Sequence, residues 1–144
     1  MSGVSSSRSN IQHSKLDGMV RELLLGKNFA FVATINKDGS PQLSPTWVDT
    51  DGEHILINTE AKRAKVRNLR RDPRIVISLI ENSNPYNGIV IRGRVVEQIE
   101  GKAANDHIDR LNKKYKGVDI FPNKGPGVVR VIVKIRPEKI IHVS

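Results

Sequence analysis

The chain has 144 residues, a length that fits one domain with a hydrophobic core of its own. It contains no cysteine, which excludes disulfides and thiolate metal sites, and no apolar run approaches the roughly 20 residues needed to span a bilayer. A formal net charge of +9 predicts negatively charged partners: nucleic acid, an anionic membrane, or a phosphorylated or carboxylated small molecule.

The N-terminal segment is Ser-rich and lacks the apolar stretch of a secretory signal. We interpret residues 1–12 as a flexible tail and residues 13–144 as a single domain, and we expect a cytoplasmic protein. The first predicted element is a helix over residues 14–26, with Ser14 as its N-cap. Its buried face is expected to consist of the apolar residues at spacings of three and four, which are Leu16, Met19, Val20, Leu23 and Leu24.

Three strands are predicted next, over residues 29–35, 42–49 and 54–58. Asp38-Gly39 and Asp51-Gly52 separate them, and this dipeptide is typical of tight hairpin turns. The strands are therefore expected to form an antiparallel meander. Pro45 cannot donate a ladder hydrogen bond, so it should lie at an edge or a bulge.

A basic segment follows, and residues 59–71 are predicted to be helical, with Thr59 as a cap and Pro73 blocking continuation. Residues 62–74 hold seven basic residues and one acidic residue. Because a helix N-terminus binds anions, Arg63 and Lys65 near the start are candidates for holding a phosphate. The alternative is a solvated basic helix face.

The rest of the chain alternates between β-rich and helical patterns. Gly93, inside a predicted strand, is expected to mark a bulge or a barrel corner. The predicted elements are a buried strand over 75–80, a polar loop over 82–88, a strand over 89–99, a helix over 102–116 with Ala104, Ile108, Leu111 and Tyr115 on one side, and closing strands over 128–135 and 139–143.

No set of nucleophile, base and orienting group is recognisable, and no phosphate-binding glycine motif is present. The four histidines, His13, His54, His107 and His142, show no metal-ligand spacing, and His107 is expected on a helix surface. Trp47 is interpreted either as a core or interface aromatic or as a stacking residue. Tyr86 and Asn87 offer a stacking and an amide contact, or belong to an ordinary turn. Because no catalytic set of side chains is recognisable, an enzyme with this sequence is expected to depend on a cofactor for its reactivity.

Several strings of residues together resemble one family. They are Phe-Val-Ala-Thr-Ile ending at residue 35, Asp-Gly-Ser-Pro-Gln-Leu-Ser-Pro-Thr-Trp-Val ending at 48, Arg-Ala-Lys-Val-Arg-Asn-Leu-Arg-Arg-Asp-Pro-Arg ending at 74, and Asn-Pro-Tyr followed by Ile-Arg-Gly ending at 93. The chain resembles the pyridoxamine-phosphate-oxidase-like, FMN-binding split barrels, and more narrowly their branch of small coenzyme F420-dependent reductases. The resemblance implies a mainly β fold with short helices, a six-stranded antiparallel split β-barrel that works as a homodimer.

The resemblance also implies a function. It predicts hydride transfer between F420 and a small unsaturated organic substrate. The alternatives are an FMN-dependent oxidase or reductase, or a non-catalytic binding protein. Nucleic acid is not an expected partner, since no aromatic residue interrupts the basic segment, and no membrane partner is expected. No metal is predicted, and no catalytic residue is assigned. The cofactor-binding residues implied are Gln42, Ser44, Pro45, Thr46, Trp47, Asn58, Thr59, Arg63 and Lys65, with Tyr86 and Asn87 from the second subunit. The surplus of Arg67, Arg70 and Arg71 beyond one phosphate site favours F420, which carries further carboxylates.

Overall fold

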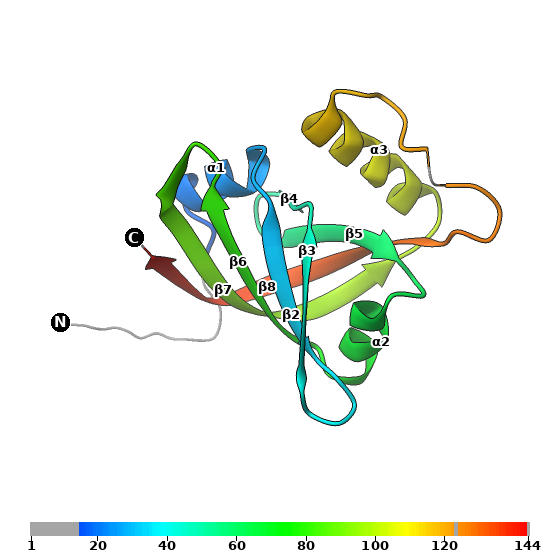
Figure 1. Cartoon of the computed structure of the whole chain (residues 1–144), viewed down its shortest axis with the longest axis horizontal. Helices are drawn as coiled ribbons and strands as arrows, with labels where there is room; N and C mark the ends of the chain where they lie inside the picture. The colour runs from blue at the N-terminus through cyan, green and yellow to red at the C-terminus, as the bar shows by residue number, and fades with distance from the viewer. Residues whose placement is uncertain (1–14, 123, 144) are drawn as a thin grey trace.

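The computed structural model describes residues 15–122 and 124–143, which contain one antiparallel sheet of seven strands. The strand order is β3-β2-β6-β7-β8-β5-β4, and three helices accompany the sheet. Figure 1 shows the sheet curling, with α2 and α3 near the end of β5. The strands are β2 (Ala30–Ile35), β3 (Pro41–Thr46), β4 (Asp49–Thr50), β5 (Ile55–Glu60), β6 (Arg74–Glu81), β7 (Asn84–Ile99) and β8 (Arg130–Val143). The helices are α1 (Gly18–Leu25), α2 (Ala64–Arg71) and α3 (Lys102–Lys116).

The predicted mainly β split-barrel architecture is confirmed, but the described residues form seven strands rather than six. The predicted strand over 42–49 is divided in two. Its last residue, Asp49, belongs to the short strand β4, which pairs with β5 at the opposite end of the sheet from β3. Residues 47 and 48 therefore carry the chain from one edge of the sheet to the other.

Both predicted Asp-Gly hairpins are present. Gly39 has a φ of 88° and Gly52 a φ of 99°, a region that side chains with a Cβ rarely adopt. The Asp38 carboxylate accepts a hydrogen bond from the backbone N–H of Ser40, and Asp51 does the same for the N–H groups of Glu53 and His54. These Asx-type contacts fix the β2–β3 and β4–β5 turns.

Gly93 lies at the predicted corner. The pairing of β7 with β8 shifts register between Arg92 and Gly93, and Pro137 is the residue opposite Gly93. A Cβ on Gly93 would lie 2.7 Å from Ile135 Cγ2 and 2.8 Å from the carbonyl oxygen of Arg136. The two long strands can therefore cross closely at this bend only because position 93 has no side chain.

Several element boundaries differ from the predictions. α1 begins at Gly18, where Asp17 rather than Ser14 is the cap: its carboxylate accepts the N–H of Val20 at 2.9 Å. The predicted tail and Ser14 lie outside the described residues. Thr59 does not cap α2, because it pairs with Val131 as part of β5. Strand pairing with β8 thus outweighs the local helix propensity of residues 59–63.

The predicted polar loop over 82–88 is also shorter in the structure. Glu81 pairs with Asn84 across a two-residue turn, and a register shift absorbs the extra residues before Gly88 pairs with Ile80. The two predicted closing strands form one strand, β8, that bends at Pro137. The prediction for residues 102–116 is confirmed, with α3 ending at Gly117 in the left-handed conformation.

The main core lies between α1 and the curled sheet and is built from buried Leu, Ile and Val side chains. Leu16, Val20, Leu23 and Leu24 of the predicted α1 face are buried, whereas Met19 is 44% exposed, which corrects its assignment to that face. A second, smaller cluster of Ile108, Leu111 and Tyr115 lies on the inner face of α3. None of the three helices combines the length and the hydropathy that a bilayer-spanning segment requires.

Candidate functional site

A pocket of about 630 Å³ opens where β3, β5, the start of α2 and the face of α3 meet. This volume lies within the range of small-molecule sites. Nine of the eleven predicted site residues line it: Gln42, Ser44, Pro45, Thr46, Trp47, Asn58, Thr59, Arg63 and Lys65. The remaining lining residues are Phe29, Glu60, Ala64, Ile108, Phe121 and Arg130, which the sequence analysis did not select.

The register of the edge strand explains part of this lining. In β3, Gln42 and Ser44 pair with Thr34 and Val32 of β2, so their side chains lie on the same face as those buried residues. No strand pairs with the other side of β3 among the described residues. β3 is therefore an edge strand, and the side chains of Gln42 and Ser44 line the pocket from it. Pro45 lies on the edge strand, as predicted.

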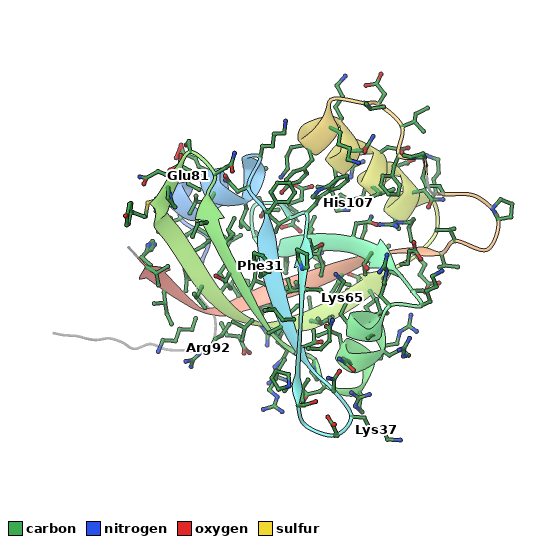
Figure 2. The ribbon with its side chains drawn as sticks, viewed as in Figure 1. Phe31, Lys37, Lys65, Glu81, Arg92 and His107 are labelled. Atoms are coloured by element: carbon green, nitrogen blue, oxygen red, sulfur yellow. The ribbon has the colours of Figure 1, made fainter. Side chains whose placement is uncertain are left out.

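Lys65 forms the centre of a cationic end of the pocket. Its side chain comes from the first turn of α2, only 8% of the residue is exposed, and Nζ donates to Ser44 Oγ at 3.2 Å. Burial lowers the pKa of Lys65, and the positive charges of Arg63 and Arg130 lower it further. A bound anion would relieve both effects. Figure 2 shows Lys65 on the inner side of α2, between the helix and the sheet.

The start of α2 adds to this environment. Arg63 occupies the N-cap position with extended backbone, and its side chain makes no capping hydrogen bond. An uncapped helix start presents these N–H groups and the positive end of the helix dipole. The Arg63 side chain is exposed at the rim of the pocket. Together, these groups have the donor chemistry that a phosphate requires.

Arg130 is the third cation and was missed by the sequence analysis. It is 7% exposed, its Nε donates to Asn58 Oδ1 at 3.0 Å, and Nη1 lies 3.9 Å from the Glu60 carboxylate. A signal was present in the sequence, because Arg130 is the one charged residue in the apolar run 128–133. A buried charge in a strand usually has a partner or a function.

The other end of the pocket is aromatic. Trp47 stacks on Tyr115 with ring centroids 5.0 Å apart and planes 7° apart, and Phe121 meets Trp47 edge-on. Phe29 lies 5.4 Å from the ring of Tyr115. Four of the six aromatic residues of the chain thus gather here. Phe29, Trp47 and Phe121 line the pocket and give this end an apolar surface, and the Arg130 guanidinium carbon lies 5.1 Å from the ring centroid of Phe121. An apolar surface beside the cations suits a planar ring system with an anionic arm.

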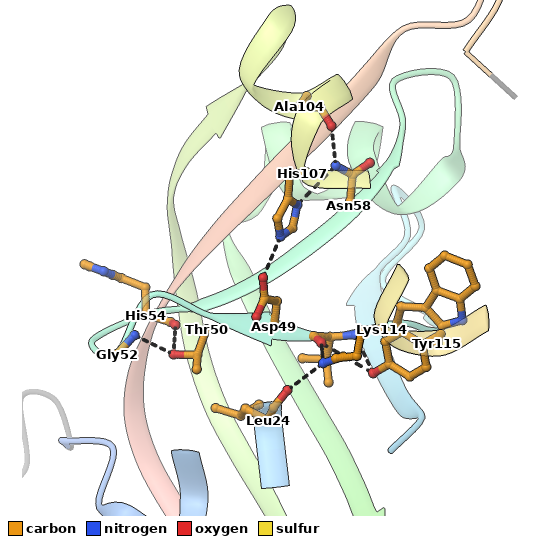
Figure 3. Close-up of polar contacts among 12 residues, drawn as sticks. Leu24, Asp49, Thr50, Gly52, His54, Asn58, Ala104, His107, Lys114 and Tyr115 are labelled. Atoms are coloured by element: carbon orange, nitrogen blue, oxygen red, sulfur yellow. Dashed lines mark hydrogen bonds and ion pairs between the residues drawn. The ribbon is translucent and has the colours of Figure 1, made fainter. Parts of the chain in front are cut away.

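His107 corrects a sequence expectation, since it is fully buried under α3 rather than on a helix surface. Its Nε2 lies 3.0 Å from Asp49 Oδ2 and its Nδ1 lies 3.2 Å from Asn58 Nδ2 (Figure 3). Burial favours a raised pKa for Asp49, but the hydrogen bonds from His107 and the Thr50 N–H hold the pKa of Asp49 below its usual value. Within the described part of the chain, no group of three or more His, Asp or Glu side chains could hold a metal ion.

Tyr86 and Asn87 do not join this pocket within one chain. Tyr86 is 77% exposed at the start of β7. Asn87 donates to Glu81 Oε1 at 3.1 Å and lines a smaller cavity beside α1. Their predicted role therefore requires a second copy of the chain.

Arg67, Arg70 and Arg71 also lie outside the pocket lining. Arg70 contacts Gln98 and Glu100, and Arg71 donates to the Ile35 carbonyl oxygen and to Asn68 Oδ1. Arg67 donates to the Lys62 carbonyl oxygen. The surplus of arginines is thus engaged by the protein itself and does not distinguish F420 from FMN.

Comparison with known proteins agrees with this description. The family model of pyridoxamine 5'-phosphate oxidase matches residues 16–144. A solved structure described as an F420 reductase is 29% identical, with a TM-score of 0.73, and the match covers 84% of this chain and 94% of that one. A conserved hypothetical protein from Mycobacterium tuberculosis is 26% identical, with a TM-score of 0.71 and coverages of 95% and 88%. General stress protein 26 from Bacillus anthracis shares the fold at 14% identity, with a TM-score of 0.64 and coverages of 87% and 91%. The chain belongs to the pyridoxamine 5'-phosphate oxidase family, a family of oxidoreductases, and has a split-barrel fold.

Proposed function

We propose that this protein binds coenzyme F420 and transfers a hydride between it and a small unsaturated organic substrate. The observation that carries the proposal is the buried ammonium of Lys65, which faces two other cations and has a neutral hydroxyl as its hydrogen-bond partner. Such a group is stabilised when a phosphate enters the pocket. The distribution of residues fits a cofactor with a flat ring and a phosphorylated arm.

Each part of the pocket has a task in this proposal. Lys65, Arg63 and the start of α2 bind the phosphate, and Arg130 supports them from β8. The edge strand β3 offers Ser44 and Gln42 as polar contacts to the ring system. The cofactor supplies the hydride chemistry when bound. The chain then orients the ring and the substrate and excludes water.

The choice of F420 rests on similarity, because the 29% identical neighbour is described as an F420 reductase. FMN is the second candidate, and the match of residues 16–144 to the pyridoxamine 5'-phosphate oxidase model favours it. Both cofactors carry a phosphate on a flexible arm, so the cationic end of the pocket suits either one. Only a direct comparison of affinities separates them.

Fluorescence titration of the purified protein with F420, FMN and FAD tests the proposal. We expect F420 to bind most tightly and Lys65→Ala to weaken its binding by about 1.5–3 kcal/mol. Lys37→Ala is the matched control, because it removes the same charge from the exposed β2–β3 turn (Figure 2). Tight FMN binding without F420 binding would reject F420, and equal losses in both variants would remove Lys65 from the site.

We further propose that two copies of the chain form a homodimer through the outer face of β2, β3 and β6. Phe31, Leu43 and Val76 are 50%, 65% and 39% exposed there, and the strand register brings them onto one face. Exposed large apolar side chains in such a group are typical of an interface. Light scattering should give a dimer for the wild type and a monomer for Leu43→Glu. A wild-type monomer would contradict this part of the proposal and the role of Tyr86 and Asn87.

A further inference from the structure

A continuous chain of buried hydrogen bonds runs from β4 through α3 to the cationic end of the pocket. Asp49 contacts His107, His107 contacts Asn58, and Asn58 accepts from Arg130. His107 is fully buried, and Asn58 and Arg130 are 6% and 7% exposed. Figure 3 shows these hydrogen bonds from Asp49 to Asn58, with the imidazole of His107 between the Asp49 carboxylate and the Asn58 amide.

The contacts of Asn58 assign the orientation of its amide. Nδ2 lies 2.8 Å from the carbonyl oxygen of Ala104, which can only accept, so this atom must be the amide nitrogen. The other proton of Nδ2 then points at His107 Nδ1, 3.2 Å away. Oδ1 is left to accept from Arg130 Nε. Both ends of the amide are therefore in use.

The same contacts assign the tautomer of His107. Because Nδ1 accepts from Asn58, it carries no proton, and Nε2 donates its proton to the Asp49 carboxylate. With a proton on Nδ1, two donors would face each other. The Asn58 amide would then have to turn over, and its NH₂ group would oppose the donor of Arg130. The state of the imidazole thus determines whether Arg130 keeps its partner.

Arg130 depends on this partner for its position. Its remaining described contacts are the Glu60 carboxylate at 3.9 Å and the ring of Phe121, whose centroid lies 5.1 Å from the guanidinium carbon. Neither contact fixes the direction of the guanidinium plane as a hydrogen bond of 3.0 Å to Nε does. A lost Asn58 acceptor would let the group rotate within the pocket.

We propose that His107 is a positioning residue: through Asn58 it fixes the guanidinium of Arg130 in the orientation that grips an anion in the pocket. Asp49 selects the required tautomer. The effect of His107 on cofactor affinity rests on the proposed function, since it takes Arg130 as one of the groups that bind the phosphate. The hydrogen-bond chain itself does not depend on which cofactor binds.

Two substitutions of similar size separate positioning from general packing. His107→Asn keeps an acceptor oxygen near the place of Nδ1, whereas His107→Gln keeps a donor near the place of Nε2 and offers Asn58 no matched acceptor. We expect His107→Gln to weaken F420 or FMN binding about fivefold and His107→Asn to stay within about twofold of wild type. Equal losses in the two variants would overturn the proposal.

A double-mutant cycle provides the second arm. Arg130→Ala should weaken binding by about 10- to 100-fold, and adding His107→Gln should then cause no further loss. A full additional loss in the Arg130→Ala background would mean that His107 acts by another route, and would overturn the proposal.

Nuclear magnetic resonance of the ligand-free protein separates this idea from the proposed function. We expect neutral His107 with the proton on Nε2, and an Arg130 Nε–H signal that shifts in His107→Gln but not in the control His54→Gln. An unchanged Arg130 signal overturns the positioning role whatever the cofactor affinity is. A shifted signal supports the positioning of Arg130 by His107 even if Arg130→Ala leaves cofactor affinity unchanged. In that case only the role of Arg130 in phosphate binding is rejected.

Discussion

The two ends of α2 carry the same kinds of residues in opposite surroundings. At the start, Lys65 is buried beside Arg63 and Arg130, and burial followed by these positive charges lowers its pKa. At the end, Arg70 contacts Glu100 and Arg74 lies 2.7 Å from Asp72, with both arginines exposed. The hydrogen bonds and charge of Arg74 lower the pKa of Asp72 to about 2. The end of the helix is thus a neutralised surface, while its start keeps excess positive charge.

This contrast shows that density of basic residues does not define an anion site. The sequence places seven basic residues between positions 62 and 74, and only the position of Arg63 and Lys65 near the predicted helix start selected them as phosphate candidates. What distinguishes Lys65 is that the fold buries it beside Arg63 and Arg130, and that no carboxylate of the described residues forms an ion pair with it. An exposed ion pair contributes little, whereas a buried cation without a counter-ion is costly until a ligand arrives.

The largest expected effect follows from replacing Lys65 with Met. Cofactor affinity should fall about 10- to 100-fold, because a charge-assisted hydrogen bond is lost. The free energy of unfolding of the cofactor-free protein should stay the same or rise by about 0.5–2 kcal/mol, because a repelled, buried charge is removed. Isothermal titration and urea unfolding measure the two quantities. A clear loss of stability would show that Lys65 supports the fold rather than a ligand.

The pH dependence of binding should show a smaller effect with a defined sign. Burial and neighbouring cations hold the pKa of Lys65 below 10.5 in the free protein, and a bound phosphate favours the ammonium and raises that pKa. Affinity should therefore be complete below the free-state pKa of Lys65 and decline as the pH rises through it. Titrations at several pH values between neutral and 10.5 measure the decline. The affinity of Lys65→Met should not change over this pH range. If the affinity of the wild type is equally independent of pH, the assignment of the phosphate contact to Lys65 is wrong.

The smallest effect is expected at the end of the helix. Arg70→Ala breaks an exposed ion pair with Glu100, so the free energy of unfolding should fall by less than about 1 kcal/mol. Cofactor affinity should stay unchanged, because Arg70 does not line the pocket. The same titration and urea unfolding experiments test this variant. If Arg70→Ala lowers cofactor affinity as much as Lys65→Met does, the claim that only the start of α2 binds the anion is wrong.

Local signals predicted much of the fold. The Asp-Gly turns and the helix over 102–116 were visible because each depends on residues close in sequence, and the Gly93 corner was visible as a glycine inside a predicted strand. Two of the failures share one cause, which is contact between distant segments. Thr59 belongs to a strand because Val131, far along the chain, pairs with it. His107 is buried because Asp49 and Asn58 lie beneath α3.

The sequence by itself determined the family, the turn positions, and nine of the residues that line the pocket. Short-range patterns and strings of residues specify these features. Arg63 and Lys65 were among these nine residues, but only the tertiary structure added Arg130 as the third cation, because burial and charge partners arise when distant segments meet. In the folded chain, Arg130 of β8 lies close enough to Lys65 of α2 to lower its pKa, while Arg70 and Arg71 contact Glu100 and the Ile35 carbonyl oxygen. His107 is connected to the pocket through the hydrogen bond between Asn58 and Arg130.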